Sequence, residues 1–170
     1  MKETKRTVFL ALMVAYSLVL YIIESMLPTL YFIAPGAKLG LTNIVTLSMM
    51  YILGAKEAFI VMVVRIVMSS IFGRSMSAFM YSFGGGVLSL LAMYLVKKAN
   101  FKSVSIIGIS VIGALFFNIG QLLVSAAVIK NISIFVYLPI LTYISLGTGI
   151  LVGYASKFMI ERTKFVKFLT

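Results

Sequence analysis

An apolar run from Val8 to Leu27 constrains the fold of this chain more than any other feature. It has roughly the 20 residues that a helix, rising about 1.5 Å per residue, needs to cross the hydrocarbon core of a membrane. The run follows a short basic start, passes Glu24 and ends at Pro28. A cleavable signal peptide would have a shorter apolar core and a small-residue cleavage site, so we interpret this run as a retained membrane helix.

Five further apolar runs follow, and the composition agrees with them. Hydrophobic residues make up 62% of the 170 residues and charged residues 11%, at a mean hydropathy of +1.13, which is too apolar for a soluble domain. The sequence therefore predicts an all-α integral membrane protein, with one six-helix transmembrane domain over residues 1–170. The expected helices cover approximately residues 8–27, 39–53, 57–73, 76–96, 104–129 and 134–156.

The positions of the cations predict how these helices are oriented. Eleven cations lie at one set of helix ends and three at the other, while Arg65 lies within a run. Because cytoplasmic loops carry an excess of Lys and Arg, both termini are expected to be cytoplasmic in a multi-pass protein of the prokaryotic cell membrane. The larger set is Lys2, Lys5, Arg6, Lys56, Lys97, Lys98, Lys102, Lys157, Arg162, Lys164 and Lys167, and the smaller set is Lys38, Arg74 and Lys130.

The residue types that the chain lacks exclude much catalytic chemistry. It has no Cys, His or Asp, and its only acids are Glu3, Glu24, Glu57 and Glu161. Thiol nucleophiles, disulfides, haem-ligating histidines and Ser-His-Asp triads are therefore excluded. We expect no catalytic residue, no metal ion and no cofactor. Membrane topology accounts for the net charge of +11, so we expect membrane lipid and no nucleic acid as a partner.

Polar side chains inside the apolar runs are the candidates for function, because such groups are costly in hydrocarbon. Arg65 lies near the middle of its run and Glu24 near the outer end of the first, within reach of a long arginine side chain. The two form either an ion pair that locks two helices or an anchor for a ligand. Asn118, Gln121 and Ser125 share one helical stripe, which bonds neighbouring helices or lines a substrate site.

Small residues mark places where helices approach closely. Ala11 and Ala15 form a small-xxx-small pair, either for packing within the bundle or for docking a partner subunit. The run of three glycines from Gly84 to Gly86 lacks the Lys-Ser/Thr of a phosphate-binding loop, so we interpret it as a close-packing or bending point. The stretch Pro35-Gly-Ala-Lys-Leu-Gly-Leu-Thr-Asn43 interrupts helix and then carries polar groups toward the bilayer.

Several of these motifs occur together: Ala11-Leu-Met-Val-Ala15, Glu24 to Pro28, Pro35 to Asn43, Gly54, Arg65 and Gly84 to Gly86. In this combination the chain resembles, over nearly its whole length, the Gx transporter family. These small membrane proteins are often labelled heptaprenyl diphosphate synthase component I. They are similar to the substrate-binding S components of energy-coupling factor (ECF) transporters.

The resemblance implies a six-helix S-component fold in which an alanine motif on the first helix docks onto a transmembrane coupling subunit. Ala11 and Ala15 match that motif. It also implies a substrate near the outer face, at the stretch that carries Lys38 and Asn43. We add further binding candidates for their polarity, namely Glu24, Arg65, Arg74, Asn118, Gln121 and Tyr143.

We therefore expect a non-catalytic subunit that binds a small metabolite, vitamin or cofactor precursor for uptake. The chain has no nucleotide-binding motif, so separate ATPases would energise it through a coupling subunit. Lys38, Arg65 and Arg74 favour an anionic ligand. The alternative is a non-catalytic membrane subunit of a prenyl, quinone or flavin-linked redox assembly. Prenyl transfer itself needs magnesium held by clustered carboxylates, which the sequence does not provide.

Overall fold

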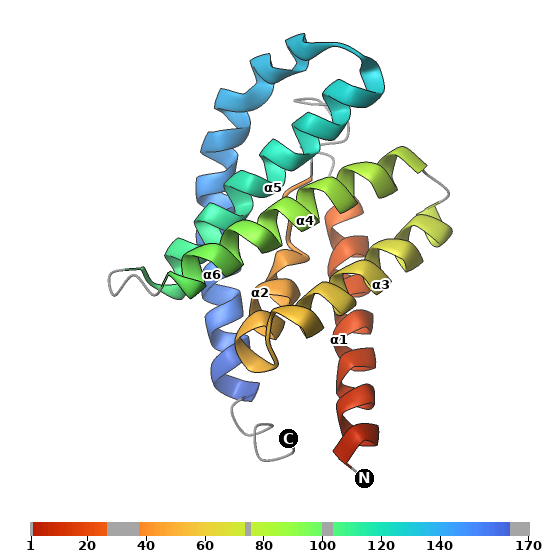
Figure 1. The fold of residues 1–170 in the computed structure, drawn as a ribbon, viewed down its shortest axis with the longest axis vertical. Helices are drawn as coiled ribbons and strands as arrows, with labels where there is room; N and C mark the ends of the chain where they lie inside the picture. The colour runs from red at the N-terminus through yellow and green to blue at the C-terminus, as the bar shows by residue number, and fades with distance from the viewer. Residues whose placement is uncertain (1, 27–37, 74–75, 100–103, 164–170) are drawn as a thin grey trace.

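Every regular element in the described part of the chain is a helix. The computed structural model describes residues 2–26, 38–73, 76–99 and 104–163 (Figure 1). Each expected helical segment coincides with one α-helix, so the prediction of an all-α fold is confirmed. The helices are α1 (Lys2–Ser25), α2 (Asn43–Ile52), α3 (Ala55–Gly73), α4 (Met76–Lys98), α5 (Ile106–Ile129) and α6 (Leu138–Thr163), with a 3-10 helix η2 (Ile132–Tyr137) before α6.

Four helical segments of the described ranges are long and apolar enough to cross a membrane. They are Glu3–Ser25, Met76–Lys98, Ile106–Ile129 and Ile132–Thr163. Neither α2 nor α3 is among them: α2 has only 10 residues, and the 19 residues of α3 include Lys56, Glu57 and Arg65. The chain is therefore a membrane protein with four candidate spans, two fewer than the six crossings that the apolar runs predict.

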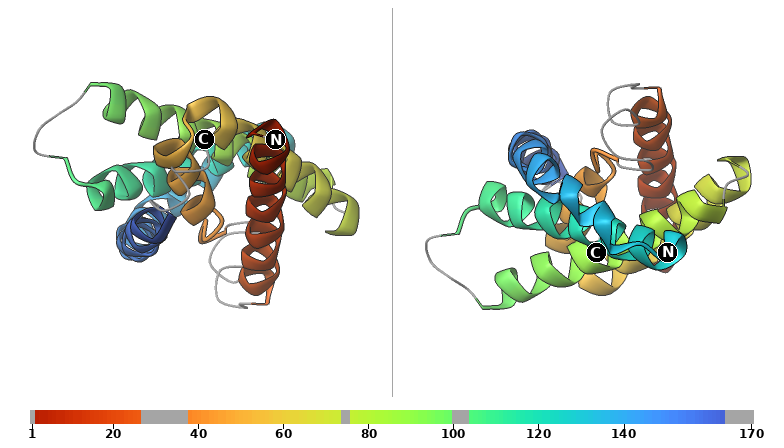
Figure 2. Two further views of the ribbon diagram at one scale, coloured as in Figure 1. Left: turned by 90° about the horizontal axis from the view of Figure 1, so that it is seen from below. Right: turned by 90° about the horizontal axis from the view of Figure 1, so that it is seen from above.

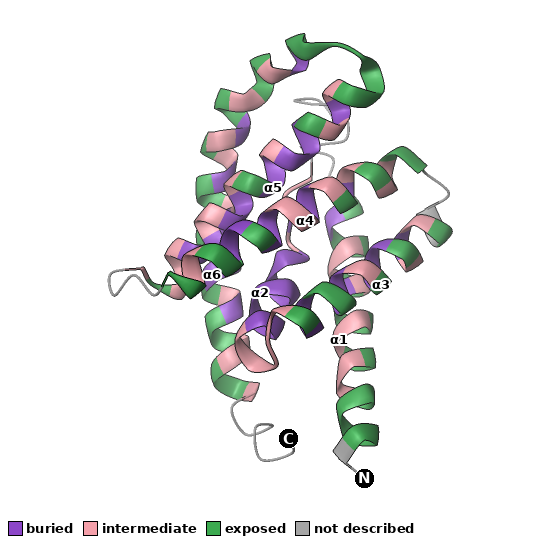
Figure 3. Ribbon diagram, viewed as in Figure 1, coloured by how far each residue is buried: buried purple, intermediate pink, exposed green. Residues whose placement is uncertain are grey.

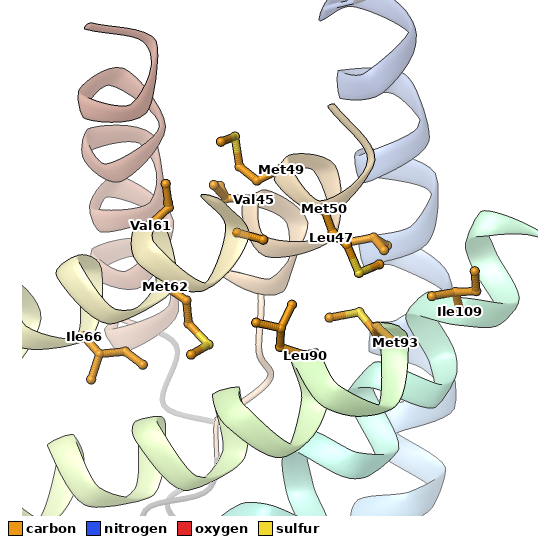
Figure 4. Close-up of a cluster of buried hydrophobic side chains, with 11 residues drawn as sticks. Val45, Leu47, Met49, Met50, Val61, Met62, Ile66, Leu90, Met93 and Ile109 are labelled. Carbon is orange, nitrogen blue, oxygen red and sulfur yellow. The ribbon is translucent and has the colours of Figure 1, made fainter. Parts of the chain in front are cut away.

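The short helix α2 lies in the interior of the molecule, between α1 and α6 (Figure 2). All its residues from Asn43 to Met50 are buried, and it packs against α3, α4, α5 and α6. A helix that is apolar or small on every face is stable only where water is excluded, in a protein core or in a membrane, and α2 is enclosed by other helices. Figure 4 shows the resulting core, in which Val45, Leu47, Met49 and Met50 lie among Val61, Met62, Ile66, Leu90, Met93 and Ile109.

Glycines let α4 and α5 cross with their backbones in contact. A Cβ atom on Gly120 would lie 2.6 Å from the carbonyl oxygen of Gly84 and 2.8 Å from Cα of Gly85. On the other side of α5, a Cβ atom on Gly149 of α6 would lie 2.6 Å from Cα of Val111. The close-packing role predicted for the glycine run of α4 is confirmed.

The start of α1 and the end of α6 lie at the same end of the molecule (Figure 1). At the start of α1, Arg6 forms a salt bridge with Glu57 at the beginning of α3. Lys97, in the last turn of α4, donates a 2.6 Å hydrogen bond from Nζ to the carbonyl of Met50. That carbonyl belongs to the last turn of α2, where carbonyls have no partner within the helix, so Lys97 caps α2.

Many large apolar residues of α1 and α6 are exposed. Figure 3 shows exposed positions, in green, along both helices. Exposed apolar surface of this extent is unusual for a soluble monomer, and contact with lipid removes its cost. The exposed positions support lipid contact along both helices. They include Val8, Leu12, Val19 and Ile22 on α1, and Ile150, Leu151, Tyr154 and Phe158 on α6.

Candidate ligand-binding site

Polar side chains from four helices meet the segment before α2 near the last turn of α1. Each of these side chains comes from a different element, so only the folded chain brings them together. We call this group the Arg65 cluster. Its members are Glu24 of α1, Lys38 before α2, Arg65 of α3, Ser82 of α4 and Gln121 of α5.

Glu24 holds the segment before α2 in place. The backbone N–H of Gly40 donates a 2.6 Å hydrogen bond to Glu24 Oε1, and the Glu24 side chain is 7% exposed. Gly40 has φ +78°, a conformation that favours glycine. A Cβ atom there would lie 3.1 Å from Asn43 Nδ2 and 3.3 Å from Cδ1 of Phe117, so the backbone favours glycine and a larger residue would also have to displace these side chains slightly.

Lys38 makes contacts from both its backbone and its side chain. Its backbone N–H donates to Gln121 Oε1 at 3.3 Å, and its Nζ donates to Ser82 Oγ at 3.1 Å. The same ammonium lies 4.4 Å from the ring centroid of Tyr21, which is a cation–π distance. Burial lowers the pKa of Lys38 to about 8, the carboxylate of Glu24 opposes this shift, and the charge of Arg65 adds to it.

Arg65 is almost completely enclosed, with 2% of its surface exposed. Its Nε and Nη2 atoms have no hydrogen-bond partner among the described residues. Glu24 interacts with Arg65 through its charge, but the two side chains do not form a salt bridge in the described structure. The structure therefore does not contain an ion pair between Glu24 and Arg65 that locks α1 to α3. Two hydrogen-bond donors of the buried Arg65 side chain have no partner among the described residues.

The polar residues of the predicted stripe on α5 contact two different neighbours, the segment before α2 and the helix α6. Gln121 faces the Arg65 cluster, where its Oε1 accepts from Lys38 and its Nε2 has no partner among the described residues. Asn118 instead donates from Nδ2 to Ser145 Oγ at 2.7 Å and ties α5 to α6. Ser125 is buried farther along the same helix. Of this stripe, Gln121 is the residue that belongs to the site.

The remaining sequence candidates lie in different places. Asn43 is buried beside Gly40, and its Oδ1 has no partner in the described part of the chain. Tyr143 is 76% exposed on α6 and is not part of the Arg65 cluster. Arg74 lies outside the described residues, as do Pro35 to Ala37. Ala11 and Ala15 are both exposed on α1.

Two residues of the site were not among the sequence candidates. Tyr21 lies one helical turn before Glu24, and Ser82 lies two residues before the glycine run. A tyrosine and a serine are both common within membrane helices, so their residue types carry little signal. Only their spacing on the same helix faces as Glu24 and Gly85 could have indicated them.

The donor set of the cluster is suited to an oxyanion. It offers an ammonium, a guanidinium and a side-chain amide N–H, while its one carboxylate is bonded to a backbone amide. Such charge-assisted donors bind carboxylate and phosphate oxygens more strongly than neutral groups do. Within the described ranges, no group of three or more His, Cys, Asp or Glu side chains could hold a metal ion.

Long apolar helices around a buried, partly unsatisfied polar cluster define a helical membrane protein with an internal polar site. Residues 13–159 match the family model described as heptaprenyl diphosphate synthase component I, and the chain belongs to that family. The resemblance found from the sequence motifs is thereby confirmed. No curated protein and no solved structure matches this chain.

Proposed function

We propose that this chain is a membrane-embedded substrate-binding subunit, similar to an ECF S component, for uptake of a small metabolite, vitamin or cofactor precursor. The observation that supports this most is the pair of unused donors on Arg65, a cation enclosed by the helices of a membrane protein. Ionisable groups inside membrane proteins are costly and usually serve function, and buried polar atoms normally have partners. A bound substrate would supply those partners.

The distribution of charge supports an outward-facing site. The basic start of α1 and the basic end of α4 both belong to the set of ends that the positive-inside bias assigns to the cytoplasm. Glu24 lies at the opposite end of α1, so the Arg65 cluster would lie toward the outside. A substrate-binding subunit for uptake needs its site on that side.

The exposed alanines of α1 support a separate energising module. Because Ala11 and Ala15 are exposed, they contribute little to packing within the bundle. Small residues on a membrane helix allow another helix to approach closely. We propose that a transmembrane coupling subunit docks there and links the chain to ATPases, and that the chain itself is not an enzyme.

Purification of the tagged chain from its native host in mild detergent, followed by native mass spectrometry, tests this proposal. We expect a small molecule bound to the chain and co-purification of a membrane subunit with ATPases. Reconstituted vesicles that hold this complex should accumulate the molecule with ATP and not with a non-hydrolysable analogue. A chain that carries no small molecule and associates with no ATPase would contradict the proposal.

A second candidate is a non-catalytic membrane subunit of a prenyl, quinone or flavin-linked redox assembly, and the family description agrees with its prenyl form. The described residues contain no carboxylate cluster to hold the magnesium that prenyl transfer needs, so another subunit would carry the chemistry. The same native spectra distinguish the two candidates. A bound isoprenoid or flavin together with a soluble synthase or redox subunit, and no ATPase, would favour this alternative.

A further inference from the structure

The unused donors of Arg65 lie on one particular edge of its guanidinium. Nε and Nη2 are adjacent on this edge, and their N–H bonds point the same way, so that they match the two oxygens of a carboxylate or phosphate. Both atoms are buried and have no partner among the described residues. Arg65 therefore presents the edge that binds oxyanions in bidentate geometry.

Glu24 does not occupy this edge. Its Oε1 accepts the N–H of Gly40 at 2.6 Å, and no salt bridge joins it to Arg65. The carboxylate instead fixes the backbone of the segment that carries Lys38. In their usual charge states, Lys38 and Arg65 carry two positive charges and Glu24 carries one negative charge. One positive charge is left, and it matches a monoanion better than a dianion.

Gln121 adds a hydrogen-bond donor, and the contact with Lys38 shows which atom of its amide group is the donor. The backbone N–H of Lys38 can only donate, so the side-chain atom that it meets at 3.3 Å must be the carbonyl oxygen of the Gln121 amide. The amide nitrogen Nε2 then points elsewhere, and it is buried without a partner in the described structure. The cluster thus contains three N–H-bearing atoms without a partner among the described residues, namely Arg65 Nε, Arg65 Nη2 and Gln121 Nε2. Its carboxylate, Glu24, already accepts the N–H of Gly40.

We propose that the Arg65 cluster binds a monoanionic oxyanion group of the transported compound, either a carboxylate or a phosphodiester. Arg65 binds it in bidentate fashion through Nε and Nη2, Lys38 provides the second positive charge, and Gln121 Nε2 donates a further hydrogen bond. This inference rests on the proposed uptake function and names the chemical class of the substrate. Glu24 acts as a positioning residue that holds Lys38 in the cluster.

The test compares what native mass spectrometry finds on the wild-type chain and on four variants, Arg65→Gln, Arg65→Lys, Gln121→Glu and Asn118→Asp. Gln121→Glu keeps the acceptor for the Lys38 N–H but replaces the free donor with a negative charge. Asn118→Asp makes the same chemical change one turn away on α5, at the residue that bonds α6. Only monodisperse, helical preparations are compared, and where Arg65→Gln does not fold, Arg65→Lys and Gln121→Glu carry the test.

We expect fragmentation of the bound compound to reveal a single carboxylate or phosphodiester. Its occupancy should fall roughly tenfold or more in Arg65→Gln and Gln121→Glu, because charge-assisted hydrogen bonds are lost. It should fall less in Arg65→Lys, which keeps the charge and loses the bidentate edge, and remain unchanged in Asn118→Asp.

A neutral bound compound would overturn this inference, and so would an anion that Arg65→Gln retains as well as the wild type. Either result leaves the uptake function standing if ATPases co-purify. A membrane phospholipid as the only occupant would also overturn it, because its phosphodiester would then come from the bilayer and not from a transported compound. Absence of both a small molecule and an ATPase would overturn the inference together with the uptake function.

Discussion

The backbone N–H of Gly40 donates a 2.6 Å hydrogen bond to Oε1 of Glu24, joining the last turn of α1 to the segment that leads into α2. A carboxylate buried among apolar helices needs a donor, and here a backbone amide provides it. Glu24 forms no salt bridge with Arg65 in the described structure. Glu24 thus has a structural role, and Nε and Nη2 of Arg65 have no partner among the described residues.

Replacement of Glu24 tests whether this contact holds the segment in place. Glu24→Ala removes the acceptor and leaves the Gly40 N–H buried and unpaired, so we expect a loss of about 2 kcal/mol in stability. Glu24→Gln keeps an acceptor without the charge, so we expect a smaller loss, about 1 kcal/mol. Thermal unfolding in detergent measures both values. Equal stability of wild type and Glu24→Ala would mean that other contacts hold the segment.

The pKa of Lys38 predicts that anion binding depends on pH. Burial lowers this pKa from 10.5 to about 8, so the ammonium is charged below pH 8 and loses its proton as the pH rises through that value. Affinity for an anionic ligand should therefore fall between about pH 7 and pH 9, whereas an unshifted lysine would keep its charge over this range. Binding of the purified ligand, measured at a series of pH values, checks this expectation.

Lys38→Arg is the matched control for the pH dependence. An arginine stays protonated throughout this range, so the affinity of the variant should not fall. A decline of the same size in Lys38→Arg would assign the pH dependence to the ligand or to another group, and would contradict the role of Lys38.

The apolar runs predicted where the helices lie because their lengths and interruptions are local properties of the sequence. The runs could not predict that α2 would contact all five of the other α-helices, because this depends on how the helices pack. The number of crossings shows the same limit. An apolar helix interior to a bundle and one that faces lipid have similar sequences, so apolarity alone predicts α2 and α3 as spans. Among the described residues, four segments have the length and composition to cross a membrane, so the count of six crossings stays a prediction.

The charged residues of the site and Gln121 were predictable from the sequence, but Tyr21, Ser82 and the hydrogen-bond partners were not. Glu24 and Arg65 were found because a charge in an apolar run is unusual. The partner of Glu24 is a backbone N–H, and every residue except proline has one, so no residue type indicated it. Asn118 and Gln121 are three residues apart and about 60° apart around α5, which is enough for one to face α6 and the other the Arg65 cluster.

Gly120→Ala tests the close crossing of α4 and α5. The added Cβ atom would lie 2.6 Å from the carbonyl oxygen of Gly84 and 2.8 Å from Cα of Gly85, and backbone atoms cannot move aside as a flexible side chain can. The helices must separate, and we expect a loss of about 2 kcal/mol in stability, a typical cost of overpacking. Ligand occupancy should fall as well, because Gln121 follows Gly120 directly.

Gly147→Ala on α6 is the matched control, since a Cβ atom there would have nothing within 4 Å. Alanine has the higher helix propensity, so this variant should gain about 0.5 to 1 kcal/mol. Thermal unfolding of the two variants should therefore shift in opposite directions. A loss of equal size in both would mean that the cost comes from the substitution itself and not from the crossing.

Large side chains at Ala11 and Ala15 test the proposed docking face on α1. Both residues are exposed, so Ala11→Trp and Ala15→Trp should change stability by no more than about 0.5 kcal/mol. Association with the coupling subunit should be lost, because a bulky side chain prevents the close approach that small residues permit. Ile23→Trp, which alters an exposed position on another side of α1, should leave the association intact. Co-purification measures the association and thermal unfolding measures the stability. Lower stability of Ala11→Trp and Ala15→Trp would assign these alanines to packing within the bundle. Retained association with the coupling subunit would mean that the docking surface lies elsewhere.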